Sequence, residues 1–503
     1  MVSIKRNTIA NYIGQSYGIL VGLIVTPLYL KYLGAEAYGL VGFFALMQAW
    51  LQVLDLGLTP TLARQVAFAR GQKDGFENFK KLLRSFELIF FAVAVAVILV
   101  VYLSSAWISE VWVKAEILGF STLVYCIGLM GLMVGLRWFT GLYRSGISGM
   151  EDQVWLNIVN IILASLRFIG ALVLLIYFTQ NVRHFFIYQL VIGILELWVF
   201  AYHFYRKLPA TKHRPKLLEF DWLSVKRVLP FTLGLAYSSA IWILVTQTDK
   251  LILSGILSLA DFGYFSLVAL VAGGVTALSG PISQAIMPRM TLLISQGKRN
   301  EMLLIYRQAS QVVLLISLSV SLMISLYAEQ ILFAWTGDRA AAAWGGGVLV
   351  WFALGNGILA IGAFQYYLQN AFGYLKLHVI GSTVSALIQL PIIYYAAVNY
   401  GAQGAGIAWF CFRLIWFLCW TPIIHRRFVP GFHLTWMLKD VLPIVATTSG
   451  LALTIYFCIP LSFLGSRLNL FIGIMVLGCF LLAMASLSVK VIRQRMFELI
   501  KSM

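Results

Sequence analysis

Apolar runs long enough to cross a lipid bilayer recur along almost the whole chain, and they constrain its fold more than any other feature. A membrane-spanning helix needs about 20 mostly apolar residues, and fourteen stretches fit that template. They lie at roughly 9–30, 38–60, 86–104, 117–137, 153–178, 184–204, 229–253, 262–287, 309–328, 346–369, 375–398, 403–424, 440–460 and 468–490. The sequence therefore predicts an all-α membrane protein with about 14 transmembrane helices.

Composition excludes an ordinary soluble domain. Of the 503 residues, 61% are hydrophobic and only 11% are charged, whereas soluble domains average about 45–50% apolar and about 25% charged residues. Lipid must therefore solvate most of the surface. The first apolar run follows Lys5 and Arg6 and has no small-residue cleavage site, so it is predicted to be a spanning helix rather than a cleaved signal.

The positive residues predict the orientation. With the N-terminus inside and loops assigned alternately, the inner side holds 29 of the 37 Lys and Arg residues. The outer side holds six, namely Lys31, Lys114, Arg183, Lys250, Arg339 and Arg467. Because positive residues concentrate on the cytoplasmic side of membrane proteins, we expect both termini to be cytoplasmic. The same bias accounts for the net charge of +18 without a nucleic-acid partner.

An internal repeat organises the spans. An offset of 224 residues places AEAYG at 35–39 on LADFG at 259–263 and Gly149 on Gly373. Chance similarity between apolar segments is the alternative explanation. Both copies start from the predicted cytoplasmic side, so the repeat is parallel about an axis along the membrane normal, which is one of the arrangements known in transporters.

We therefore expect two six-helix lobes in a pseudo-twofold arrangement, followed by two extra helices. The expected boundaries are 1–208 for the N-terminal lobe, 209–228 for a cytoplasmic linker, 229–427 for the C-terminal lobe, and 428–503 for the two extra helices and a cytoplasmic tail.

Signals for enzymatic chemistry are absent from the sequence. There is no HExxH, no Walker loop, no GxGxxG after a strand and no GxSxG elbow. The widest outer stretch, near 329–345, carries only Glu329, Asp338 and Arg339 as charged residues. We expect neither an enzyme nor a bound metal or cofactor.

The first span carries a ladder of glycines, Gly14, Gly18 and Gly22. Such a ladder usually lets helices approach closely, and plain packing is the simpler interpretation. The alternative is that this face lets the helix slide or bend, helped by Pro27. Pro281 is a second candidate for bending, because a proline inside a helix frees a backbone carbonyl.

Charges inside the predicted spans are the strongest candidates for function. A charge at the bilayer centre costs about 2.5–3.5 kcal/mol on insertion scales, so it tends to face a wet cavity or a partner. Arg167 and Arg413 fall near the midplane, one in each lobe, and Lys250 lies in the seventh span. We expect these three to contact an anionic headgroup.

Acids inside the spans are the candidates for charge balance and ion coupling. They are Asp55, Glu196 and Asp249. A structural ion pair of Arg167 or Arg413 with Glu196 or Asp55 is the alternative to a binding role.

Three further arginines, Arg64, Arg144 and Arg289, lie near the predicted inner surface. We expect them to line the cytoplasmic entrance, with interfacial anchoring as the alternative. Arginine suits a phosphate site because its planar fork binds phosphate through two hydrogen bonds and stays charged.

Several segments together resemble a known family. They are NTIANYIGQSYGILVGLIVTPLYLKYLGAEAYGL, LDLGLTPTLARQVA, TDKLILSGILSLADFGYFSLV and YYLQNAFGYLKLHV. This pattern of Gly, Asp, Tyr and Arg positions over about residues 1–430 resembles Wzx-type O-antigen and polysaccharide flippases of the multidrug/oligosaccharidyl-lipid/polysaccharide exporter superfamily.

The resemblance implies a V-shaped two-lobe fold in the bacterial inner membrane that works by alternating access. It implies an undecaprenyl-pyrophosphate-linked oligosaccharide as cargo and a proton or sodium gradient as the driving force. Membrane lipids are further partners, and glycan polymerase or chain-length proteins are candidate partners. The alternatives are a lipid II flippase, which also has two extra helices, a small-molecule exporter of the same superfamily, and a membrane glycan polymerase or transferase.

Overall fold

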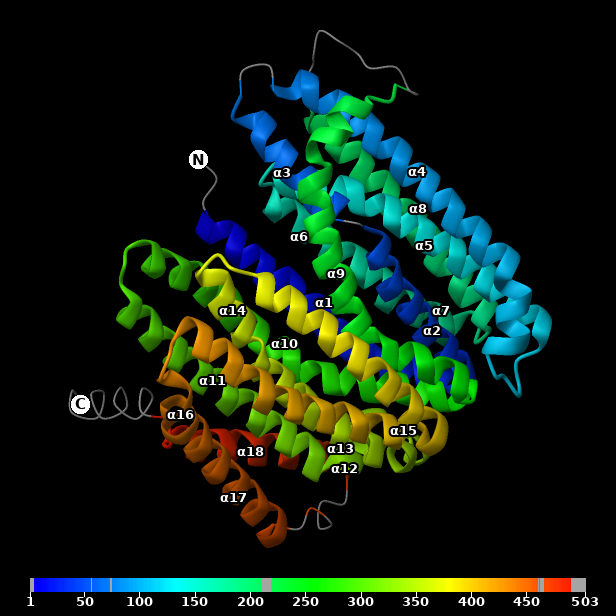
Figure 1. Cartoon of the computed structure of the whole chain (residues 1–503). Helices are drawn as coiled ribbons and strands as arrows, with labels where there is room; N and C mark the ends of the chain where they lie inside the picture. The colour runs from blue at the N-terminus through cyan, green and yellow to red at the C-terminus, as the bar shows by residue number, and fades with distance from the viewer. Residues whose placement is uncertain are drawn as a thin grey trace. The chain divides into compact units, whose positions relative to one another are not determined.

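The computed structural model describes residues 4–55, 57–72, 75–209, 219–459, 461 and 466–489, and these are almost entirely helical (Figure 1). Twelve helices in this part of the chain are long and apolar enough to cross a membrane. The expectation of an all-α, multi-pass membrane protein is confirmed, while the count of fourteen spans stays a prediction.

The chain divides into two compact units, Met1–Gly263 and Tyr264–Met503. In the first unit, α4, α5 and α8 pack side by side around buried Phe86, Phe90 and Leu142. The α-helices of this unit are α1 (Ile4–Leu33), α2 (Ala35–Leu51), α3 (Leu58–Arg70), α4 (Gly75–Trp107), α5 (Phe120–Gly149), α6 (Gln153–Ser165), α7 (Ala171–Tyr177), α8 (Val182–Lys207) and α9 (Trp222–Ile256). Short turns are η1 (Gln52–Asp55), η2 (Ile108–Trp112) and η3 (Leu166–Gly170).

In the second unit, α11 packs against α13, α17 and α18. Buried Asp440 accepts hydrogen bonds from Arg307 (2.6 and 2.8 Å) and Gln311 (2.7 Å), which ties the last helices to α11. The elements are α10 (Leu259–Ser295, which starts in the first unit), α11 (Arg299–Leu326), α12 (Ala328–Thr336), α13 (Arg339–Gly362), α14 (Phe364–Ala371), α15 (Lys376–Phe428), α16 (Phe432–Trp436), η4 (Met437–Val441), α17 (Leu442–Cys458) and α18 (Arg467–Ser486).

The 53-residue α15 is two helices joined at Gly401, whose φ of 61° and ψ of −152° are not helical. The two halves run side by side and antiparallel, because Gly381 lies against the ring of Trp420 and Gly404 lies against the carbonyl of Ala396. The predicted spans 375–398 and 403–424 are these two halves.

Several helices extend beyond their predicted spans, and three differences bear on the site or the span count. The span 38–60 is wrong at its inner end. The helix stops at Asp55, and the separate helix α3 starts at Leu58, directly after Gly57, whose φ is 71°. The span 117–137 is too short, since α5 continues to Gly149. The span 229–253 lies within α9, which is not among the twelve helices that meet the criteria for crossing a membrane.

Helix starts follow the offset found in the sequence. The starts of α2 and α10, Ala35 and Leu259, are 224 residues apart, as are those of α4 and α11, Gly75 and Arg299. One difference concerns the second helix of each copy. The first copy breaks into α2, η1 and α3, while α10 is continuous and carries Pro281 at the position that corresponds to Gly57.

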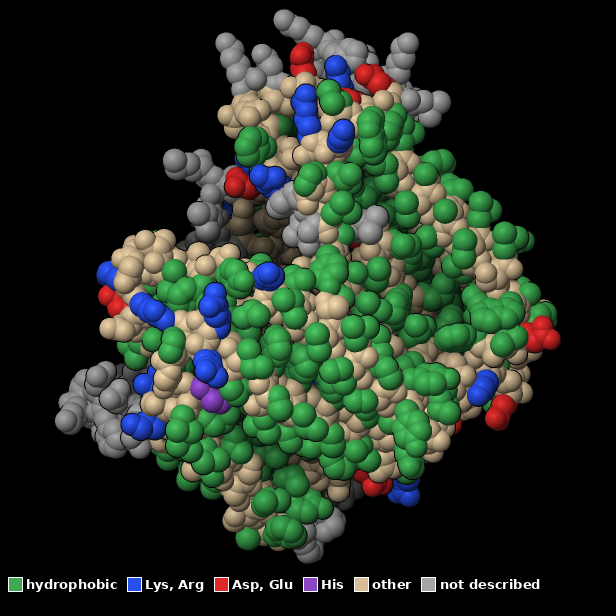
Figure 2. Space-filling view, viewed as in Figure 1, with side chains coloured by type: hydrophobic (Ala, Val, Ile, Leu, Met, Phe, Trp, Pro, Cys, Tyr) green, Lys and Arg blue, Asp and Glu red, His purple; other side chains and the backbone are tan. Residues whose placement is uncertain are grey.

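Large apolar side chains are exposed all along the helices, as lipid contact requires. Leu103, Phe178 and Phe457 are each more than three-quarters exposed. Hydrophobic side chains cover most of the visible surface, and Lys and Arg gather near its margins (Figure 2).

Candidate functional site

Arg167 and Glu196 form an ion pair in the first unit. The guanidinium donates from Nη2 to the Glu196 carboxylate. The Glu196 side chain is 8% exposed and that of Arg167 is 22% exposed. The acid is therefore held inside the helix packing, while the arginine keeps access to the surroundings.

Arg167 lies in a π-helical turn, η3, which links α6 to α7. A π-helical turn changes the regular hydrogen-bond ladder, and such turns are frequent at functional sites. Side chains satisfy the carbonyls of this turn: Tyr188 bonds to Leu166 (2.7 Å), Gln189 to Arg167 (2.9 Å) and Tyr29 to Phe168 (2.8 Å). Helices α1 and α8 therefore fix the backbone that carries Arg167.

Two more arginines act on the same pair. The guanidinium of Arg137 in α5 donates to Gln48 Oε1 and lies 5.2 Å from the ring of Phe44 in α2. Arg137 and Arg144 both lie on α5, within electrostatic range of Arg167 and Glu196. We call Arg137, Arg144 and Arg167 the arginine cluster. Glu196 balances only part of its positive charge.

Arg413 belongs to the second unit and lies in the second half of α15. It is 6% exposed, and its guanidinium carbon is 4.2 Å from the ring centroid of Trp409. Trp409 donates from its indole nitrogen to Asn356 (3.2 Å), and Asn356 in turn donates to the carbonyl of Ala272 (2.9 Å). The packing of α13 on α15 therefore holds the ring beneath this arginine.

Asp55 and Lys250 have other local contacts in the structure. Asp55 accepts hydrogen bonds from the backbone and hydroxyl of Thr59, so it caps the start of α3. Asp249 is buried on α9, at 4% exposure. Lys250 donates to the carbonyl of Thr246 (3.1 Å) and to the Gln247 amide oxygen (2.8 Å).

The entrance candidates are exposed. Arg64 lies on α3, with its guanidinium carbon 5.8 Å from the ring centroid of Phe68. Arg144 and Arg289 are exposed on α5 and α10.

The bending candidates lie in two different settings. In α1, Gly14 lies against Asn157 and Gly22 against Phe168, while Gly18 has open space around it. The contacts at Gly14 and Gly22 support the packing interpretation, and bending stays a prediction. Pro27 is buried in α1, and Pro281 is exposed in α10.

Sequence reasoning missed Arg137 as a member of the site. The predicted span 117–137 ends at this residue, which places it at the edge of the inner loops. The structure continues α5 for twelve further residues, to Gly149, and Arg137 falls inside the helix. The run from Arg137 to Gly149 contains no proline, which was the available signal for a longer helix.

The chain matches known proteins over most of its length. A family model described as polysaccharide biosynthesis protein matches residues 4–294. A putative O-antigen transporter of Shigella flexneri is 20% identical over 410 residues, which are 81% of this chain and 94% of that protein.

Solved structures show the same fold. The lipid II flippase MurJ in an inward closed conformation has a TM-score of 0.70 at 14% identity, and the match covers 96% of this chain and 98% of that one. An inward-facing multidrug resistance MATE family transporter of the MOP superfamily has a TM-score of 0.67 at 13% identity, over 80% and 94% of the two chains. The resemblance to exporters is confirmed, and these relatives are transporters rather than enzymes.

Proposed function

Because the chain belongs to the polysaccharide biosynthesis protein family, we propose that it is a flippase for an undecaprenyl-pyrophosphate-linked oligosaccharide. The cargo is an O-antigen or related polysaccharide repeat unit, moved across the bacterial inner membrane by alternating access. The Shigella relative, itself a putative O-antigen transporter, supports this substrate class.

The arginine cluster is the observation that carries the proposal. Placing several guanidinium groups within membrane-spanning helices is costly. Among the described residues, Glu196 is the acid that forms an ion pair with this cluster, and one carboxylate offsets three guanidinium groups only in part. A pyrophosphate in the cargo would supply the missing negative charge through paired hydrogen bonds with the guanidinium forks. The lipid tail of the cargo stays in the bilayer meanwhile.

Glu196 suggests how transport is coupled to a gradient. Its carboxylate accepts a hydrogen bond from the Arg167 guanidinium. A pyrophosphate competes for the same guanidinium, and protonation of Glu196 removes the competitor. Proton binding on this acid, or sodium binding near it, would therefore alternate with cargo binding. Asp55 and Asp249 are the other acids in the proposal, and Arg413 and Lys250 are its further headgroup contacts.

The proposal also assigns roles to the rest of the chain. The lobes 1–208 and 229–427 would move relative to one another, with 428–503 as an appended part. Gly14, Gly18, Gly22, Pro27 and Pro281 would allow helices to bend, and Arg64, Arg144 and Arg289 would line the cytoplasmic entrance.

Cytoplasmic termini are part of the same proposal. A single cysteine placed in the 205–228 segment should not react with an impermeant thiol reagent in intact cells and should react after the cells are opened. Labelling in intact cells would reverse the orientation. Residues 210–218 of this segment lie outside the described residues.

The decisive experiment measures where the lipid-linked glycan accumulates. Deletion should strand the lipid-linked oligosaccharide on the cytoplasmic face and remove surface glycan, and the wild-type gene should restore both. Arg167→Ala should fail to restore surface glycan although the protein accumulates in the membrane. Arg167→Lys should restore activity in part if charge suffices, and hardly at all if the planar fork is needed.

Other outcomes would contradict the proposal. Surface display of single repeat units after deletion would indicate a polymerase. Accumulation of lipid II would indicate the peptidoglycan precursor as cargo. A change confined to drug sensitivity would indicate a small-molecule exporter.

A further inference from the structure

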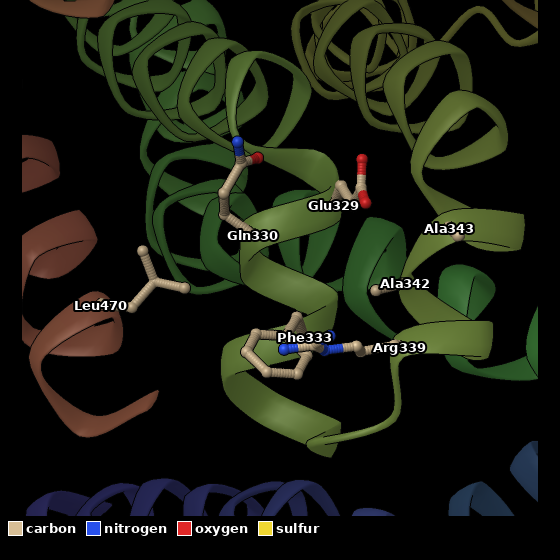
Figure 3. A pocket seen from close by; sticks show the side chains of 7 residues that line it. All are labelled: Glu329, Gln330, Phe333, Arg339, Ala342, Ala343 and Leu470. Carbon is tan, nitrogen blue, oxygen red and sulfur yellow. The ribbon is translucent and has the colours of Figure 1, made fainter. Parts of the chain in front are cut away.

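A cavity of about 470 Å³ opens in the second unit between α12, α13 and α18. Figure 3 shows Glu329 and Gln330 toward one end, Phe333 and Arg339 toward the other, and Leu470 on the facing helix. Its volume falls in the range of ligand sites, about 300–1,000 Å³. The lining residues are Glu329, Gln330, Phe333, Arg339, Ala342, Ala343 and Leu470.

Small residues at the start of α13 keep this space open. After Arg339 the helix continues with four alanines, Trp344 and three glycines. A Cβ on Gly346 would lie only 3.2 Å from the Cβ of Glu329, so α12 approaches α13 closely here. Ala342 and Ala343 line the cavity without filling it.

The lining holds one acid and one base on different helices. Within the part of the chain that the structure describes, no ion pair joins Glu329 to Arg339. The guanidinium carbon of Arg339 instead lies 5.8 Å from the ring centroid of Phe333. Glu329 is exposed. The two opposite charges are therefore both available to a ligand that carries the complementary pair.

The surroundings indicate that this ligand comes from the membrane. Leu470 closes one side of the cavity, and its neighbours on α18, Leu468 and Phe471, are 67% and 45% exposed. Apolar side chains exposed on a spanning helix face acyl chains. A lipid could therefore rest its chains against α18 and place its headgroup in the cavity.

We propose that this cavity binds the headgroup of a zwitterionic aminophospholipid. The Glu329 carboxylate accepts hydrogen bonds from the primary ammonium, and the Arg339 guanidinium donates to the phosphate. Both are charge-assisted hydrogen bonds, which are stronger than bonds between neutral groups. One acid and one base balance a zwitterion, whereas a purely anionic headgroup would leave Glu329 opposed to it. The site is separate from the arginine cluster and does not depend on the proposed cargo.

Glu329 and Arg339 should interact differently with different lipid headgroups. Phosphatidylethanolamine offers N–H donors to Glu329, phosphatidylcholine offers a cation without N–H donors, and phosphatidylglycerol offers no cation. All three present a phosphate to Arg339. We therefore expect Glu329 to select among the lipids and Arg339 to strengthen the binding of all of them.

The test is native mass spectrometry of the purified full-length protein with each of the three lipids, matched in acyl chains. The wild type should prefer phosphatidylethanolamine over phosphatidylcholine by about three- to tenfold, the range for one charge-assisted hydrogen bond at a partly exposed site. Glu329→Gln should bring that ratio close to one and increase phosphatidylglycerol binding. Arg339→Gln should weaken all three.

Two matched control variants remove one acid and one base outside the second unit. Glu116→Gln changes an exposed residue and Arg183→Gln a partly exposed residue of the first unit, and both should leave the lipid ratios unchanged. The proposal is overturned if the wild type shows no preference or if the preference survives Glu329→Gln. It is also overturned if maltotriose, rather than lipid, binds in a manner abolished by Arg339→Gln, since the cavity would then be a saccharide site.

Discussion

Gly39 and Gly263 hold the same position in the two copies of the internal repeat, and their backbones meet. A Cβ on Gly263 would lie 2.5 Å from the carbonyl oxygen of Ala35 and 3.4 Å from the Cα of Gly39. In return, a Cβ on Gly39 would collide with the carbonyl oxygen of Leu259, the repeat counterpart of Ala35. The two contacts are reciprocal, because each glycine lies against the carbonyl oxygen of the residue four positions before the other glycine.

Alanine at either glycine should therefore destabilise the protein. Each Cβ meets backbone, which cannot rotate away, so we expect a loss of about 1–3 kcal/mol as for other overpacked sites. The apparent Tm of the detergent-solubilised protein measures it. Gly141→Ala is the control, because nothing lies within 4 Å of its Cβ position in α5. An unchanged Tm in Gly39→Ala and Gly263→Ala would mean that the backbones at these two glycines are not in close contact.

Gly401 should be irreplaceable for a different reason. Its φ of 61° with ψ of −152° falls in a region open essentially to glycine alone, and a side chain there costs about 1–3 kcal/mol. Gly401→Ala should lower the Tm, whereas Gly450→Ala, in the helical α17 with open space around it, should raise it slightly. Equal effects of the two substitutions would contradict the turn at Gly401 that joins the two halves of α15.

The ion pair of Arg167 and Glu196 allows stability to be separated from transport. Arg167→Ala leaves the buried Glu196 carboxylate without its main partner, and losses of about 3–5 kcal/mol are typical for breaking buried pairs. The double variant Arg167→Ala/Glu196→Gln should recover most of the Tm but none of the surface glycan. Recovery of surface glycan in the double variant would reduce Arg167 to a structural role.

Gln48 offers a test of Arg137. Gln48→Glu places a carboxylate beside the Arg137 guanidinium, which already bonds to the Gln48 amide oxygen. The new ion pair should preserve the fold and reduce transport by neutralising one cation of the arginine cluster. Surface glycan and protein level in complemented cells measure the two effects. Gln48→Ala, which adds no charge, should reduce transport less.

Asp152 lies between α5 and α6, and we expect its contacts with Lys207 and His203 to be sensitive to acid. Burial by itself raises the pKa of Asp152, but hydrogen bonds from Lys207 (2.6 Å) and His203 (2.9 Å) outweigh it and hold this pKa below its usual value. A lowered pKa stabilises the fold above the ordinary value of 3.8, and that stability is lost as the pH falls through the folded-state pKa.

Asp152→Asn should therefore lower the Tm at pH 7 by the equivalent of about 0.2–1 kcal/mol, because the Lys207 side chain is 45% exposed and solvent screens the pair. The gap between wild type and variant should close as the pH falls below about 3.8. Thermal unfolding at several pH values measures this, and a gap that widens in acid would reverse the assigned sign.

The sequence by itself determined the membrane class, the position of most helices and the internal repeat. Apolar runs are local, and each helix satisfies its own backbone in lipid, so length and composition suffice to find it. The segments at 35–39 and 259–263 likewise revealed the repeat whose glycines meet at Gly39 and Gly263. The boundaries that failed, near Gly57 and after Arg137, depend on backbone turns and helix extension that hydropathy does not record.

Only the tertiary structure decided which charges meet. Arg167 and Glu196 are 29 residues apart on separate helices, and their pairing depends on how each helix is rotated about its axis. That rotation follows from side-chain packing between helices, such as the bonds of Tyr29 and Gln189 to the turn that carries Arg167. The same holds for the cavity beside Glu329, because an apolar sequence shows which residues can face lipid but not which small residues leave a space.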